Sequence, residues 1–126
     1  MNKPLRNILI VDDESSLRNL LSLALKTITE ESDTAADGQE ALEKIVISNY
    51  DVILADISMP RLSGTELVNQ IRQKGNQTPV ILCSAHFPDE AFAIAERDST
   101  VKLMAKPMSL PAIRELVLQV GNKEFA

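Results

Sequence analysis

The chain has 126 residues, of which 44% are hydrophobic and 25% are charged, proportions typical of one globular domain. A net charge of −5 and an aromatic content of 3% exclude the basic surface and the stacking rings of a nucleic-acid-binding protein, so we expect no direct contact with nucleic acid. The lone Cys83 excludes an intramolecular disulfide and favours a reducing, cytoplasmic location. The first apolar run, residues 8–11, is too short for a signal peptide or a membrane span, so we expect no membrane association.

Short apolar runs alternate with amphipathic stretches from the first residues onward. Residues 8–11 predict a strand, and the apolar spacing after them predicts a helix over 14–29. The apolar face of that helix comprises Leu17, Leu20, Leu21, Ala24, Leu25 and Ile28. Residues 32–36 are assigned to a strand mainly because the alternation requires one there. Asp37 stands three residues before a glutamate, the spacing of a capping box, and predicts a second helix over 37–48.

The second half of the chain continues the alternation. The apolar runs at 52–55 and 80–83 have no polar interruption and predict buried strands that helices cover on both faces, and residues 101–105 predict a fifth strand. Three helices are expected between and after these strands, one ending at Gly75, one beginning near Pro88 and one capped by Ser109. The apolar face of the middle one comprises Ala91, Phe92 and Ala95. Five strands alternating with five helices predict a doubly wound parallel α/β sheet, because right-handed crossovers make consecutive strands parallel.

Polar side chains follow four of the five predicted strands. They are Asp12 and Asp13 after the first strand, Asp56 after the third, Ser84 after the fourth and Lys106 after the fifth. Any one of them is explained equally well by a strand end that emerges into solvent. In open parallel sheets, however, the carboxyl ends of the strands form the ligand-binding edge, so these groups are expected to converge.

Converging carboxylates need cations beside them. Two negative charges about 4 Å apart repel by about 4 kcal/mol at an effective dielectric constant of 20. Lys106 supplies one positive charge, and a hard divalent ion, Mg²⁺, held by carboxylate, carbonyl and water oxygens, supplies the rest. A metal beside a carboxylate, a hydroxyl and an ammonium group predicts phosphoryl transfer in which the carboxylate attacks.

With these residues in order, the sequence resembles the receiver domains of bacterial two-component response regulators, of which the chemotaxis regulator is the single-domain type. The resemblance rests on ILIVDDE at 8–14, DVILADISMP at 51–60 with Gly64, Ser84-Ala85, and Lys106-Pro107. It covers about residues 7–120 and implies a single receiver domain over 1–126. It also implies a flavodoxin-like five-stranded sheet in the order 2-1-3-4-5 and a cis bond between Lys106 and Pro107.

The resemblance implies a role for each acidic residue. Asp56 matches the phosphoacceptor, which takes a phosphoryl group from the phosphohistidine of a sensor kinase. Asp12 and Asp13 match the acidic pair that holds Mg²⁺ together with Asp56, and the Ser58 backbone carbonyl matches a further ligand. The implied cofactor is therefore Mg²⁺.

The resemblance covers the strand ends at 84 and 106 as well, with two departures nearby. Ser84 matches the hydroxyl that moves toward the phosphoryl group, and Lys106 matches the lysine that pairs with that group. Three residues before the lysine, receivers usually carry Tyr or Phe, whose ring turns inward on activation, whereas this chain has Leu103. The Gly-Ala pair usual before the fifth strand is replaced by Ser99-Thr100.

The leading interpretation is a signalling switch of a two-component system rather than an enzyme, with phosphotransfer to itself and slow autodephosphorylation as its only chemistry. The expected partners are a sensor histidine kinase or phosphotransfer protein, and a downstream effector or a second receiver. The effector or second receiver is expected to dock on the helix that begins near Pro88, the strand over 101–105 and the helix capped by Ser109. The alternative is a pseudo-receiver that binds proteins without phosphorylation. An aspartyl-phosphate phosphatase would need a carboxylate where Ser58 stands, two residues after Asp56. His86 is either a solvated loop residue or a group above the phosphoryl position.

Overall fold

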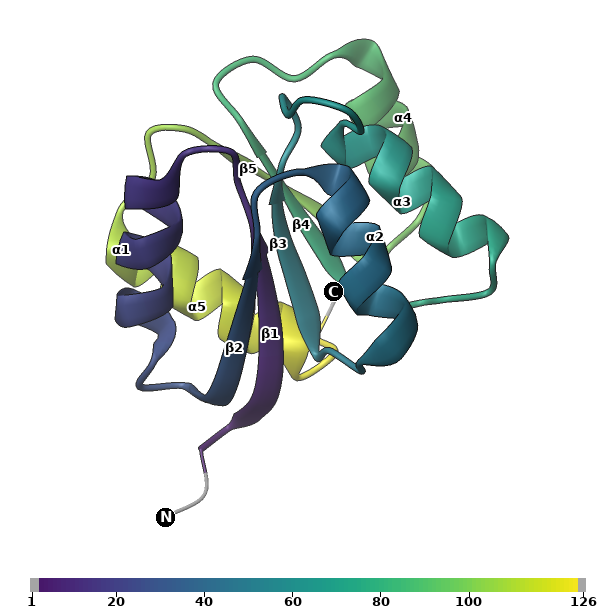
Figure 1. Cartoon of the computed structure of the whole chain (residues 1–126). Coiled ribbons are helices and arrows are strands. Elements are labelled where there is room, and N and C mark those ends of the chain that lie inside the picture. Colours follow the sequence, from purple (N-terminus) through teal and green to yellow (C-terminus); the bar gives the residue numbers. More distant parts are fainter. Residues whose placement is uncertain (1–2, 125–126) are drawn as a thin grey trace.

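The computed structural model describes residues 3–124, and within them one parallel sheet runs in the order β2-β1-β3-β4-β5 (Figure 1). The strands are β1 (Leu5–Val11), β2 (Thr29–Ala35), β3 (Val52–Asp56), β4 (Val80–Ser84) and β5 (Val101–Ala105). The helices are α1 (Ser15–Leu25), α2 (Gly38–Ile47), α3 (Gly64–Gln73), α4 (Asp89–Arg97) and α5 (Leu110–Gly121). The predicted doubly wound, flavodoxin-like α/β fold and its strand order are confirmed.

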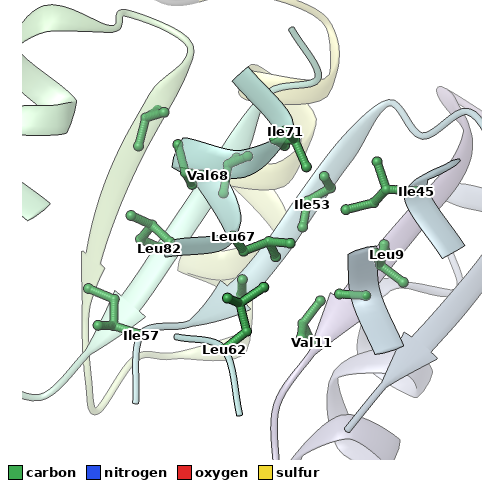
Figure 2. Close-up of a cluster of buried hydrophobic side chains, with 14 of the residues drawn as sticks. Leu9, Val11, Ile45, Ile53, Ile57, Leu62, Leu67, Val68, Ile71 and Leu82 are labelled. Carbon is green, nitrogen blue, oxygen red and sulfur yellow. The ribbon is translucent and has the colours of Figure 1, made fainter. Parts of the chain in front are cut away.

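Helices cover both faces of the sheet. Helices α1 and α5 lie on one face, and α2, α3 and α4 lie on the other (Figure 1). Alternate strand residues point to opposite cores, so Leu9 packs beneath α2 and α3 whereas Ile8 packs beneath α1 and α5. Figure 2 shows the first of these cores, in which Ile53 and Leu82 of the sheet meet Leu67 of α3. Burial on both faces explains why the central strands read as uninterrupted apolar runs.

The predicted helix over 14–29 is too long, and this is a correction. Helix α1 ends at Leu25, and the backbone N–H of Ile28 already donates to the Leu25 carbonyl in the turn that follows. Strand β2 begins at Thr29, where it pairs with Leu5 of β1. The sequence of β2, TEESDTA, has no apolar alternation, because β2 is an edge strand with two exposed and three half-buried residues. Pairing with β1, rather than local propensity, makes this segment a strand.

Two residues predicted for the apolar faces of α1 and α4 point to solvent. Leu20 of α1 is 47% exposed and Phe92 of α4 is 55% exposed, whereas Ile94, which the predicted face omitted, is buried. Phe92 lies about 100° around the helix from the buried Ala91, on the side away from Ile94, and so falls outside the stripe that covers the sheet. Its ring instead meets the ring of Phe87 edge to face, with centroids 5.8 Å apart.

Side chains cap the N-termini of α2 and α3. The Asp37 side chain accepts a hydrogen bond from the Glu40 N–H at 2.9 Å, as predicted. The reciprocal bond of a capping box is absent there, because Glu40 accepts from the Ala36 N–H instead. A complete capping box is present at α3, between Ser63 and Glu66. Sequence reasoning missed that box, although its Ser-x-x-Glu spacing is visible in the chain.

A polar cluster secures the entry to β5, where Ser99-Thr100 replaces the usual Gly-Ala pair. Arg72 of α3 donates to Asp98 at 2.8 Å and to the Thr100 hydroxyl at 2.9 Å. Asp98 in turn accepts from the Thr100 N–H and hydroxyl. Within the described chain, this cluster ties the α4–β5 loop to α3. Burial would raise the pKa of Asp98, but the hydrogen bonds from Thr100 and Arg72 outweigh it and hold that pKa below its ordinary value.

The depressed pKa of Asp98 predicts how stability depends on pH. A carboxyl with a lower pKa in the folded state contributes stability above its unfolded pKa of about 3.9, and this contribution is lost as the pH falls through the folded pKa. We expect Asp98→Asn to lower the free energy of unfolding by about 1–3 kcal/mol at pH 7 and by less near pH 3. Urea unfolding at both pH values measures the difference, with the exposed Asp89→Asn as control. An Asp98→Asn deficit that is independent of pH contradicts the prediction.

Candidate functional site

The parallel pairing of four neighbouring strands brings the polar strand ends to one edge of the sheet. Val11 is in register with Ala55, so Asp12 and Asp56 leave β1 and β3 at the same level. Asp56 lies opposite Cys83, one residue before Ser84. Ser84 pairs with Ala105, and the Lys106 N–H donates to the Ser84 carbonyl at 2.9 Å. The carboxyl ends of β1, β3, β4 and β5 therefore meet around Asp56.

Three carboxylates form a cluster at this edge. Asp12, Asp13 and Asp56 each offer one oxygen, and these oxygens lie within 4.8 Å of one another. Asp12 and Asp56 are buried, with 4% and 9% of their surface exposed, whereas Asp13 is exposed. This donor set could bind a metal ion, because hard divalent cations prefer several carboxylate oxygens at one point.

Lys106 bridges two of the carboxylates. Its Nζ lies 3.1 Å from Asp56 Oδ1 and 3.4 Å from Asp12 Oδ2. Burial would lower the pKa of Lys106, but pairing with these two carboxylates raises it overall, so the group remains an ammonium ion. Its charge offsets part of the repulsion within the cluster.

The phosphoacceptor candidate has a perturbed carboxyl group. Burial raises the pKa of Asp56 above its ordinary value, and the charges of Asp12 and Asp13 raise it further, while Lys106 opposes both effects. The negative charge on Asp56 is therefore costly in the absence of a second cation. A cation placed among these oxygens relieves that cost.

Asp12 is held in place by backbone contacts. Its Oδ1 accepts from the Glu14 N–H at 2.9 Å, and its carbonyl accepts from Arg18 Nη1 at 2.6 Å. These contacts attach the end of β1 to the first turns of α1. They leave Asp12 with a fixed orientation, while Asp13 faces solvent.

Ser84 is engaged with its own loop rather than with the carboxylates. Its hydroxyl donates to the His86 carbonyl at 2.8 Å and accepts from the His86 N–H at 3.2 Å. Ser84 is buried and the His86 residue is exposed. The contribution of His86 is thus its backbone, which sequence reasoning missed. The signal for it is the tendency of a serine hydroxyl to bond the backbone two residues later.

Gly64 allows α3 to begin in close contact with the backbone of Asp56. A Cβ at Gly64 would lie 2.6 Å from the Asp56 carbonyl oxygen, too close for any other residue without a backbone shift. The Gly64 N–H donates to the Ile57 carbonyl at 3.0 Å, closing the loop that follows β3. This close approach fixes the peptide that carries Asp56.

Comparison with known proteins decides the family. The model of the response regulator receiver domain matches residues 8–118, most of the chain. The chain belongs to the response regulator receiver domain family. It is a signalling module of the two-component type rather than a classical enzyme, with an acidic pocket formed by Asp12, Asp13 and Asp56 beside Lys106.

Curated relatives are longer than this receiver. It is 38% identical over 120 residues to "Regulator of RpoS" of Escherichia coli K12, covering 93% of this chain and 36% of that protein. It is 38% identical over 113 residues to the transcriptional regulatory protein ResD of Bacillus subtilis, covering 90% of this chain and 45% of that protein. The chain thus spans between a third and a half of the length of these relatives.

Solved structures of receivers superpose on nearly the whole chain. The receiver domain of Francisella response regulator 1452 matches with a TM-score of 0.82 and 28% identity, covering 94% of this chain and 98% of that one. The chemotaxis response regulator CheY4 of Vibrio cholerae matches with a TM-score of 0.81 and 29% identity, covering 92% and 98% of the two chains. The resemblance seen in the sequence is confirmed.

Two further expectations concern the segment between β5 and α5. The Lys106–Pro107 bond is cis, as the resemblance implies, and Ser109 caps α5 by accepting from the Ala112 N–H at 3.2 Å. Leu103, at the usual aromatic position, is partly buried and packs against the core beneath α2, α3 and α4.

Within residues 3–124 no helix combines the length and the apolar character needed to cross a lipid bilayer.

Proposed function

We propose that this receiver accepts a phosphoryl group on Asp56 from the phosphohistidine of a sensor histidine kinase or a phosphotransfer protein, and that the modification alters a partner-binding face. The observation that carries the proposal is the position of Lys106. Its ammonium group touches the buried Asp56 carboxylate at 3.1 Å, at the point where three carboxylates converge. The ammonium group of Lys106 opposes the rise in the pKa of Asp56 that burial and the neighbouring carboxylates cause, and it places a cation beside the oxygens of an incoming phosphoryl group.

The proposed step is a substitution at phosphorus. An Asp56 carboxylate oxygen forms the new P–O bond, the P–N bond to the histidine breaks, and the electron pair of that bond stays on the imidazole nitrogen, which takes up a proton from water. The product is an acyl phosphate on Asp56. Lys106 neutralises the phosphoryl oxygens, and the Ser84 hydroxyl donates to one of them after leaving the His86 carbonyl.

Mg²⁺ fits the donor set of this edge. Asp13 and Asp56 would hold it through their carboxylates, Asp12 would hold it directly or through water, and the Ser58 backbone carbonyl would complete the protein ligands. When bound, the ion supplies the positive charge that lets a phosphoryl dianion approach three carboxylates.

The output face is proposed from the same geometry. Ser84 ends β4, and the loop after it leads through Phe87 into α4, where Phe87 packs against the exposed Phe92. A shift of Ser84 therefore reaches the surface formed by α4, β5 and α5, where an effector or a second receiver docks. We propose that residues 1–126 form a single receiver domain with this function.

The proposal is tested by intact mass measurement. Incubation with acetyl phosphate and Mg²⁺ adds the mass of one phosphoryl group, and peptide mapping after reduction of the acyl phosphate with borohydride locates it at Asp56. A protein whose mass is unchanged under these conditions contradicts the proposed function and favours a phosphorylation-independent binding module.

The metal site makes a separate prediction at Asp13. Because Asp13 is the exposed member of the cluster, its removal deletes a ligand without opening a cavity. We expect Asp13→Ala to raise the Mg²⁺ dissociation constant at least about tenfold. In metal-free buffer it should unfold no more easily than the parent, and the relief of repulsion contributes about 1 kcal/mol. Titration calorimetry and urea unfolding measure the two effects, with the exposed Glu43→Ala as control. An unchanged metal affinity refutes the assignment of Asp13.

A further inference from the structure

Arg61 has an unusual backbone conformation in the loop that follows Asp56. Its φ is 67°, in the left-handed region where residues other than glycine are uncommon. The residue lies in the β3–α3 loop (residues 57–63), which also contains the Ser58 carbonyl proposed as a metal ligand. Such conformations persist where the surrounding structure holds them, and they often lie at functional sites.

An ion pair with the start of α2 holds Arg61. Its Nε donates to Asp37 Oδ2 at 3.1 Å, and its Nη2 donates to the same oxygen. The Asp37 side chain is only 7% exposed, whereas that of Arg61 is 69% exposed. The other oxygen of Asp37 accepts from the Glu40 N–H. One carboxylate therefore caps α2 and holds the β3–α3 loop at the same time.

The electrostatics of Asp37 agree with this double role. The hydrogen bond from the Glu40 N–H, followed by that from Arg61, lowers the pKa of Asp37 below its ordinary value. The carboxylate is thus charged throughout the neutral range, and the pairing with Arg61 is maintained there.

A second contact lies beside the ion pair. A Cβ at Gly38 would collide with the Leu62 carbonyl oxygen and would lie 2.7 Å from the Leu62 Cβ. The Leu62 side chain is buried in the core beneath α2 and α3, as Figure 2 shows. Arg61 therefore pairs with Asp37, and Leu62 packs against Gly38. The far end of the loop is fixed separately, by Gly64 against Asp56.

We propose that Arg61 is a positioning residue, which fixes the β3–α3 loop on the N-terminus of α2 and thereby sets the place of the Ser58 carbonyl beside Asp56. The inference rests on the proposed function and adds a residue to it. Glycine would adopt the left-handed conformation without cost, so the arginine is explained by its side chain and not by its backbone. Loss of the ion pair frees the loop and weakens the metal site without removing a ligand.

Three variants separate the ion pair from the backbone and from the cap. Arg61→Gly keeps the left-handed conformation and removes the guanidinium group. Asp37→Asn keeps a side chain that caps helices and removes the charge. Arg61→Lys restores a cation that can pair with Asp37. Lys74→Gln, which is exposed at the far end of α3, removes the same charge as Arg61→Gly and serves as the control.

The experiment measures amide hydrogen exchange in the metal-free protein and Mg²⁺ affinity by NMR titration. We expect Arg61→Gly and Asp37→Asn to raise the Mg²⁺ dissociation constant about tenfold, the lower end of the effect that loss of a group orienting a metal ligand has. Exchange of the Leu62 N–H, which donates to the Pro60 carbonyl at 2.7 Å, should accelerate in the same variants. Arg61→Lys should recover part of both effects, and Lys74→Gln should show neither.

The outcomes distinguish the inference from the proposed function. If Arg61→Gly lowers the free energy of unfolding but leaves the Mg²⁺ dissociation constant unchanged, the ion pair is merely structural and the inference is overturned. A parent protein that does not bind Mg²⁺ contradicts the proposed function itself. In that case unchanged exchange at Leu62 in Arg61→Gly still overturns the inference independently of the metal.

Discussion

Asp56→Asn is expected to abolish phosphoryl incorporation from acetyl phosphate. An amide oxygen carries no negative charge and is a poor nucleophile, so the P–O bond does not form. The fold should tolerate the change, because Asn has nearly the same shape and its neutral side chain relieves the repulsion from Asp12 and Asp13. Intact mass spectrometry over the time in which the parent is fully modified measures the loss.

Removal of the metal should have the same effect as removal of the nucleophile. With excess chelator the parent should stay unmodified, because a phosphoryl dianion then meets three carboxylates with only Lys106 beside them. Excess Mg²⁺ should restore the reaction.

The matched control for Asp56→Asn is Asp89→Asn, a change of the same type on an exposed residue of α4. Incorporation that persists in Asp56→Asn, on Asp12 or Asp13, contradicts the assignment of the phosphoacceptor.

Ser84→Ala is expected to uncouple phosphorylation from α4. In the structure the Ser84 hydroxyl is bonded to His86, and the loop continues through Phe87 to the ring of Phe92. A hydrogen bond from Ser84 to a charged phosphoryl oxygen is worth about 1.5–3 kcal/mol, which shifts the ratio of active to inactive form by about tenfold or more. Without it, most of the response of α4 should disappear.

Leu103→Ala is expected to change that response little. A leucine has no hydroxyl to exchange partners and no ring to turn, so its rotation gains less packing energy than that of an aromatic residue. Because the Leu103 side chain packs against the core, the substitution should lower the free energy of unfolding. Most of the chemical-shift response of α4 should remain.

The readout for both variants is amide chemical shifts with and without beryllofluoride, which mimics the phosphoryl group. The chain has no tryptophan, so quenching of tryptophan fluorescence cannot report the change. Lys106→Ala completes the series. It should still be phosphorylated to some extent, but the shifts of β5 should shrink, because its ammonium group joins Asp56 to that strand. A larger loss in Leu103→Ala than in Ser84→Ala identifies Leu103 as the switch residue, against our expectation.

Some elements could be predicted because their signals are local. The apolar runs of β3 and β4 have no polar interruption, which in a chain of alternating elements leaves only a strand covered on both faces. Asp37 and Ser109 cap their helices as their positions indicated, because a cap depends on residues within one turn. Other elements have no such signal. The polar β2 is a strand because β1 lies beside it, and Leu20 and Phe92 are exposed because of where α1 and α4 lie on the sheet.

The candidate site could likewise be predicted only in part from the sequence. The sequence alone determined which groups end the strands, Asp12, Asp13, Asp56, Ser84 and Lys106, since a side chain's chemistry and its place after an apolar run are properties of the chain itself. Only the tertiary structure decided how those groups meet. The contact of Lys106 with Asp56 and the ion pair between Asp37 and Arg61 depend on distances between elements. Those distances are set by the packing of helices on a twisted sheet, which no local pattern encodes.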